Sequence, residues 1–133
     1  MDDQAKLIKK SVIKRTLLGG LLSVLIAGLA IVYITVLYSS TTIPNQVLYF
    51  FCFVFLIPSY VVESAFPYIT SYPPRIYDFI SYTITFIFWF IAGGIIAYFI
   101  KRNKVAFGIW FLLYLLMIPI MFTIYFLKNF IFN

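Results

Sequence analysis

Four apolar segments, each long enough to cross a lipid bilayer, constrain this chain more than any other feature of its sequence. They comprise residues 17–38, 47–66, 79–100 and 105–127, and they are 22, 20, 22 and 23 residues long. As helices they would measure roughly 30 to 34 Å, and the hydrocarbon core of a bilayer is about 30 Å thick. Of the ten basic and four acidic side chains, only Glu63 lies inside a segment. The pattern predicts an integral membrane bundle of four transmembrane helices.

The composition supports this prediction and excludes several other classes of protein. Hydrophobic residues make up 64% of the 133 residues and charged residues 11%, whereas a soluble domain has about 25% charged residues. A nucleic-acid-binding module, a disulfide scaffold and a disordered chain are excluded, because the polar surface, the cysteines and the low hydrophobicity that they need are missing. The apolar runs also lack the alternation of barrel strands. We therefore expect an all-α fold, with residues 1–133 forming a single membrane domain.

Residues 1–16 precede the first apolar segment and carry five Lys or Arg side chains. On a helix, the lysines gather on one side and apolar residues line much of the other. The segment therefore predicts a short amphipathic helix at the membrane interface, which either orients the chain or binds anionic lipid or a partner. The positive-inside rule places the N-terminus in the cytoplasm, and we expect location in the cell membrane with membrane lipids as partners.

The positive charges leave the number of crossings open. If all four segments cross, Lys101, Arg102 and Lys104 lie outside, with seven basic residues inside and three outside. If the second segment enters and leaves by one face, the balance becomes eight to two, which fits the positive-inside rule better. Pro58 lies near the middle of that segment, where proline favours a break. The alternative fold is therefore three transmembrane helices plus a re-entrant helical hairpin broken at Pro58.

The connections that flank the second segment favour a re-entrant hairpin, whereas the length of the segment favours a full crossing. Connections 39–46 and 67–78 are both rich in Ser, Thr, Tyr and Pro and contain no lysine, as if they faced one compartment. An apolar segment of twenty residues, however, normally spans the bilayer, and proline is tolerated in membrane helices. Four crossings remain the first prediction.

Glu63, Arg75 and Asp78 form the candidate ion, proton or ion-pair site. An ionisable side chain within a membrane span is a functional candidate, as a proton relay, an ion ligand or a counter-ion. Glu63 also lies four residues before Pro67, near the end of its segment. A boundary glutamate would instead hydrogen-bond to Ser59, Tyr60 or a loop amide, or pair with Arg75. Asp78 is predicted to cap the helix that follows.

Small residues at helical spacing predict two packing faces, one in the first segment and one in the third. The partner of each face lies either in this chain or in another subunit. The residues are Gly19, Ser23, Ala27 and Ala30 in the first face, and Ser81, Thr85, Gly93 and Ala97 in the second.

A cluster of tyrosines and prolines in the third quarter of the chain is a candidate docking surface for a partner subunit. It is denser than an aromatic membrane anchor requires. It comprises Tyr68, Tyr72, Pro73, Pro74 and Tyr77.

The sequence contains no histidine, one cysteine and no nucleotide-binding or hydrolase motif. We therefore expect no catalytic residue, no cofactor and no metal site, and we infer neither a nucleic-acid partner nor a soluble substrate. The leading hypothesis is a non-catalytic accessory subunit of a larger membrane complex, packed against other integral membrane subunits. The alternative is a small homo-oligomeric transporter or channel in which Glu63 couples protons or cations. A holin-like lytic protein is less favoured, because a highly charged tail is missing.

Overall fold

The computed structural model describes residues 2–38 and 46–132 of the chain. These residues form helices and short turns, and no strand occurs among them. Four helical stretches are long and apolar enough to cross a membrane, which is consistent with a multi-pass membrane protein. Most of the predicted connection 39–46 lies outside the described residues. The elements are α1 (Asp2–Tyr38), α2 (Gln46–Phe53), η1 (Val54–Leu56), α3 (Ile57–Ala65), η2 (Pro67–Ser71), α4 (Pro74–Phe99) and α5 (Asn103–Phe132).

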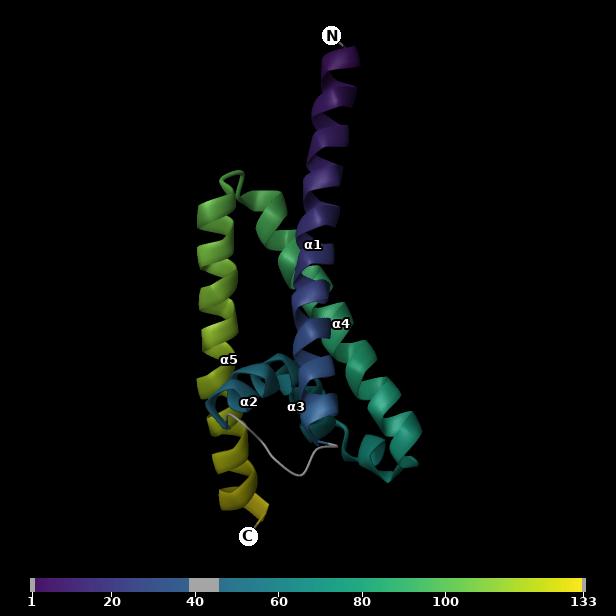
Figure 1. The fold of residues 1–133 in the computed structure, drawn as a ribbon, viewed down its shortest axis with the longest axis vertical. Coiled ribbons are helices and arrows are strands. Elements are labelled where there is room, and N and C mark those ends of the chain that lie inside the picture. The colour runs from purple at the N-terminus through teal and green to yellow at the C-terminus, as the bar shows by residue number, and fades with distance from the viewer. Residues whose placement is uncertain (1, 39–45, 133) are drawn as a thin grey trace.

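α1 is one uninterrupted helix of 37 residues. It contains no proline, and its first half is rich in Lys and Leu, which have high helix propensity. The glycine pair Gly19 and Gly20 does not break it, because both residues pack closely against α4. Residues 2–16 are therefore helical, and they continue directly into the first apolar segment without a boundary between the two. Their position at a membrane interface stays a prediction. In Figure 1 these turns continue the axis of α1 beyond the other helices.

α1 and α4 pack against each other in opposite directions. A Cβ atom added at Gly19 would lie 2.7 Å from the carbonyl oxygen of Gly93, late in α4. A Cβ atom added at Gly28, further along α1, would lie 3.7 Å from Phe86, which comes earlier in α4. The C-terminal end of α1 and the N-terminal end of α4 therefore lie at the same end of the bundle (Figure 1). The chain that connects α1 to α4 therefore begins and ends at the same end of the bundle.

The chain between α1 and α4 is a bent segment, residues 46–65, formed by α2, η1 and α3. In Figure 1 it lies in the half of the bundle that holds the end of α1 and the start of α4, and its two helices meet at an angle. Pro58 has no N–H to bond the carbonyl of Val54, and the N–H of Ile57 bonds that carbonyl instead. This bond is of the 3₁₀ type, so the break expected at Pro58 appears as η1.

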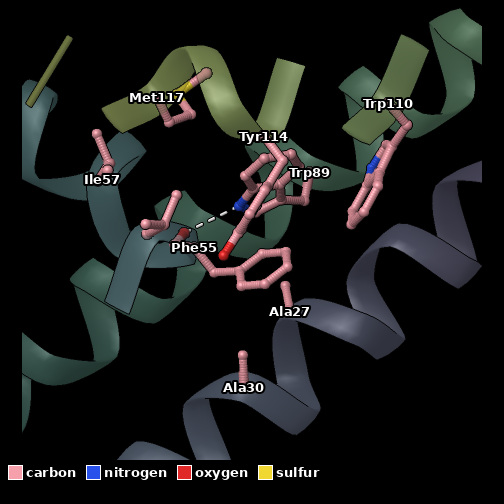
Figure 2. Packing of buried hydrophobic residues seen from close by; sticks show 9 residues of the cluster. Ala27, Ala30, Phe55, Ile57, Trp89, Trp110, Tyr114 and Met117 are labelled. Carbon is pink, nitrogen blue, oxygen red and sulfur yellow. Dashed lines mark hydrogen bonds between the residues drawn. The ribbon is translucent and has the colours of Figure 1, made fainter. Parts of the chain in front are cut away.

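Aromatic side chains from η1, α4 and α5 meet at the bend and form the centre of the core (Figure 2). The ring of Phe55 lies 5.2 Å from that of Trp89 in α4, and 5.9 and 4.7 Å from those of Trp110 and Tyr114 in α5. Ala27 of α1 is fully buried beside them. The bend therefore packs against all three long helices and forms the hydrophobic core where they meet.

Candidate functional site

Glu63 lies near the end of α3 and is 92% buried, with 8% of its surface exposed. The hydroxyl of Tyr77, in the first turns of α4, donates a hydrogen bond of 2.7 Å to Oε2 of Glu63. The other carboxylate oxygen, Oε1, is buried and has no hydrogen-bond partner. A buried acceptor without a partner costs about 1 to 3 kcal/mol. A proton, a cation or a donor from another molecule would satisfy this atom.

The Glu63–Tyr77 pair is one of three side-chain hydrogen bonds that join the bent segment to α4 among the described residues. The residues that make these hydrogen bonds are four positions apart in the bent segment, and four or eight positions apart in α4. The three bonds therefore form one line along the contact between the bent segment and α4. The contacts become more polar from the bend toward the start of α4. They are Trp89 Nε1–H donating to the Phe55 carbonyl at 2.9 Å, the Ser81 hydroxyl donating to Ser59 Oγ at 2.9 Å, and the Tyr77 hydroxyl donating to Glu63 at 2.7 Å.

Arg75 lies on the surface and makes no ion pair with Glu63 or Asp78 in the described part of the chain. The predicted pairing is therefore not formed. The residue that contacts Glu63 is instead Tyr77, two residues after Arg75 in α4, and its hydroxyl points toward α3. Helix geometry separates these two side chains, because residues two apart lie on nearly opposite faces.

Asp78 does not cap the third apolar helix, so this prediction is wrong. α4 begins at Pro74, with Pro73 as its N-cap, five residues before the predicted start at Phe79. Proline suits the first helical position because its missing N–H would have no partner there. The Pro-Pro pair thus starts α4 early and places Asp78 inside the helix, where it is exposed.

The predicted small-residue faces of α1 and α4 meet each other within the chain. A Cβ atom at Gly93 would lie 2.5 Å from the carbonyl oxygen of Gly19 and 2.5 Å from the hydroxyl of Ser23. Ala27 and Thr85 are fully buried. The remaining members are also largely buried in the bundle: Ala30, Ser81 and Ala97. These faces therefore serve internal packing and do not present a surface to a partner.

The Tyr/Pro cluster divides between the surface and the interior. Tyr68 is 63% exposed and Tyr72 is 46% exposed, and the two prolines that follow are also on the surface. Tyr77 instead turns inward to Glu63. The pairing of Tyr77 with Glu63 was not predicted from the sequence, and neither was the contact of Ser59 with Ser81. The signal for both contacts is the spacing of polar residues on either side of the connection. Ser59 and Glu63 are four residues apart before it, and Tyr77 and Ser81 are four residues apart after it.

The site offers one carboxylate, one phenol and two serine hydroxyls, a set that can bind a proton or a small cation. Within the described residues, no three His, Cys, Asp or Glu side chains come together to hold a metal ion. Comparison with protein-family models, with curated proteins and with solved structures finds no match to this chain.

Proposed function

We propose that this chain is a membrane protein in which α1, α4 and α5 cross the bilayer and the bent segment enters and leaves by one face. Four successive crossings would require α1 and α4 to run parallel, and the two helices run antiparallel. The lengths of α2 and α3 support the same arrangement. They contain 8 and 9 residues, or about 12 and 14 Å of helix, which is less than half of a hydrocarbon core of about 30 Å.

The charges support the orientation of this arrangement. With three crossings, the N-terminal turns of α1 and the short connection before α5 lie at one end of the bundle (Figure 1). Eight of the ten Lys and Arg residues belong to the N-terminal turns of α1, to this connection or to the first turn of α5. The other two are Arg75 in the first turn of α4 and Lys128 in the last turns of α5, and these helix ends lie at the opposite end of the bundle (Figure 1). The positive-inside rule then places the basic end in the cytoplasm.

Single cysteines introduced into a Cys52→Ser background test this topology in intact cells. Gln4→Cys and Asn103→Cys should react with a membrane-impermeant maleimide from the same side, and Ser71→Cys from the opposite side. Labelling of Asn103→Cys from the side opposite to Gln4→Cys would require four crossings and would overturn the arrangement.

For function, we propose a non-catalytic subunit that docks onto a larger membrane protein through its exposed aromatic surface. This surface consists of Phe66, Tyr68 and Tyr72, at the end of the bundle where the bent segment joins α4. The single observation that supports the proposal is the exposure of these three rings next to two surface prolines. Exposed aromatic rings of this kind are enriched at protein interfaces. The small-residue faces, which are used inside the chain, no longer contribute to it.

Co-purification in a mild detergent, followed by native mass spectrometry, tests the docking proposal. The wild-type chain should retain a larger integral membrane protein, and a Tyr68→Ala, Tyr72→Ala variant should lose it. Phe130→Ala, which removes an even more exposed ring near the C-terminal end of α5, is the control and should retain the partner. A wild-type chain that is monomeric and free of partners would contradict the proposal.

One observation favours a second candidate function, a proton- or cation-coupled transporter. Glu63 Oε1 is an acceptor buried without a partner, as expected of a carboxylate that binds a proton or cation during a cycle. In proteoliposomes, Glu63→Gln should abolish coupled flux. Asp78→Asn removes an exposed carboxylate of the same region and should leave flux unchanged. Unchanged flux in Glu63→Gln would exclude Glu63 from coupling.

A further inference from the structure

A cleft of about 690 Å³ lies between α1, α4 and α5 in the half of the bundle that the bent segment does not reach. Its volume falls within the range of about 300 to 1,000 Å³ that is typical of ligand sites. Its lining comes from all three long helices. Residues that line it include Lys14, Arg15, Leu18 and Leu22 of α1 and Phe107 and Trp110 of α5.

The interior of the cleft is apolar and its floor is closed. Leu18, Leu22 and Phe107 form parts of its walls. At the floor, the indole N–H of Trp110 donates a hydrogen bond to the hydroxyl of Ser23, and both side chains are buried. The ring of Trp110 in turn packs on Phe55 at the bend. The bent segment therefore ends the cleft at mid-depth in the bundle.

The mouth of the cleft is polar and positively charged. Lys14 and Arg15 line it from α1, and Asn103 lines it from the first turn of α5, where the helix dipole is positive. Arg15 is held in place because its Nε and Nη2 donate hydrogen bonds to the carbonyls of Ala97 and Tyr98 at the end of α4, at 2.7 and 3.0 Å. These carbonyls have no partner within their own helix, so the contact also closes the helix end.

No acidic side chain of the described residues lies near this mouth to neutralise it. Two of the four acidic residues of the chain, Glu63 and Asp78, belong to α3 and to the first turns of α4, which lie in the opposite half of the bundle (Figure 1). Asp2 and Asp3 lie eleven residues or more before Lys14 in the same helix, roughly 17 Å away and beyond a Debye length of about 8 Å. The mouth therefore attracts anions.

We propose that the cleft binds one anionic phospholipid of the surrounding membrane. The phosphate lies at the mouth between Lys14, Arg15 and the start of α5, and one acyl chain lies along Leu18, Leu22 and Phe107 above Trp110. A ligand that is anionic at one end and apolar along its length matches both parts of the cleft. Basic pockets between membrane helices on the cytoplasmic side bind such headgroups. A helix of a partner protein would leave the cationic mouth without a counter-charge.

Lipid exchange into nanodiscs, read by native mass spectrometry of the full-length chain, tests the headgroup site. The wild-type chain should retain phosphatidylglycerol in preference to phosphatidylcholine. Lys14→Gln should lower the retention of phosphatidylglycerol about fivefold. Lys9→Gln, which makes the same charge change at a residue of α1 that does not line the cleft, should leave it unchanged. Equal retention of the two lipids by the wild-type chain would overturn the proposal.

The acyl-chain site is tested separately with phosphatidylglycerol that carries bromine on its acyl chains. This lipid should quench the fluorescence of Trp110, and the quenched component should disappear in Trp110→Phe. Ala106→Phe places a ring in the cleft and should abolish both the quenching and the selective retention. Gly108→Phe adds the same ring where a Cβ atom meets nothing within 4 Å, and should leave both intact.

A photo-crosslinker at Phe107 identifies the occupant in native membranes. A cross-link to phospholipid is expected. A cross-link to a protein, or quenching that persists unchanged in Ala106→Phe, would show that the cleft is not a lipid site. This outcome is independent of the docking proposal, because Phe107 lies far from the exposed aromatic surface.

Discussion

The two halves of the bundle differ in what occupies the space between α1, α4 and α5. In one half, the bent segment occupies it, and Phe55 packs on Trp89 and Tyr114 at ring distances of 5.2 and 4.7 Å. We call this the filled half. In the other, the same three helices enclose a cleft of about 690 Å³ with a basic mouth. We call this the open half.

The difference shows how a short insertion divides a helical bundle. The bent segment has two helices of 8 and 9 residues, and these reach only part of the way along helices of 26 to 37 residues. Side chains that line a cleft make fewer dispersion contacts with other protein groups than side chains that pack on a neighbouring helix. We therefore expect the filled half to carry the stability of the fold, and the open half to tolerate change.

The largest expected effect is that of Trp89→Ala in the filled half. Trp89 is fully buried and its indole N–H bonds the carbonyl of Phe55. Its removal should lower the free energy of unfolding by about 3 to 5 kcal/mol, measured by unfolding in mixed detergent and dodecyl sulfate micelles. Phe130→Ala, at a site that is 77% exposed, should change it by less than about 0.5 kcal/mol. Similar losses in both variants would contradict the comparison.

Glycine-to-alanine substitutions at two positions should have effects of opposite sign. At Gly93, the added Cβ would meet the Gly19 carbonyl oxygen at 2.5 Å, so Gly93→Ala should destabilise the protein by about 1 to 3 kcal/mol. At Gly108, the added Cβ meets nothing within 4 Å, and Gly108→Ala should stabilise α5 by about 0.5 to 1 kcal/mol. The same unfolding measurement applies. If Gly93→Ala left the free energy of unfolding unchanged, α1 and α4 would not pack this closely.

Tyr77→Phe removes the hydrogen-bond donor of Glu63 and leaves a second carboxylate oxygen without a partner. The expected loss is about 1 to 3 kcal/mol in the free energy of unfolding. Tyr98→Phe, at a tyrosine that is 52% exposed, provides the control and should have little effect. If the two variants unfold alike, the Glu63–Tyr77 bond contributes nothing to stability.

The smallest effect is expected in the open half. Ala106 lines the cleft, so Ala106→Phe should change the free energy of unfolding by less than about 0.5 kcal/mol. The same substitution in the filled half, Ala27→Phe, inserts a ring at a fully buried site and should cost about 1 to 3 kcal/mol or more. Thermal melting in detergent distinguishes the pair. Equal melting temperatures for the two variants would remove the distinction between the halves.

Local features of this fold could be predicted from the sequence because their causes are local. The length of each apolar run predicted the four helical stretches, and Pro58 predicted the break. The start of α4 was missed because the third apolar run begins at residue 79 and the preceding Asp78 is a favourable N-cap residue, whereas Pro74 occupies the first helical position. The continuity of α1 was missed because an amphipathic pattern shows which side of a helix is charged, and it does not show whether the helix ends.

The candidate site was only partly predictable. Glu63 was identified because an ionisable residue in an apolar run is costly. Its partner was expected among nearby residues or at Arg75, since opposite charges attract. The packing of α3 along α4 selected Tyr77 instead. The cleft at Lys14 and Trp110 had no signal in the sequence, because its walls come from three helices that are distant in the chain.

From the sequence alone, one can conclude that this chain is helical and that its apolar segments have the length of a bilayer, whereas a break of the second segment at Pro58 remained an alternative. These properties follow from backbone hydrogen bonding and hydrophobicity within each segment. The tertiary structure decided that α1 and α4 run antiparallel, that their small-residue faces meet each other, and that one half of the bundle stays open. The physical reason is that small-residue faces allow close approach in either direction, so only the packing of the whole chain selects which faces meet.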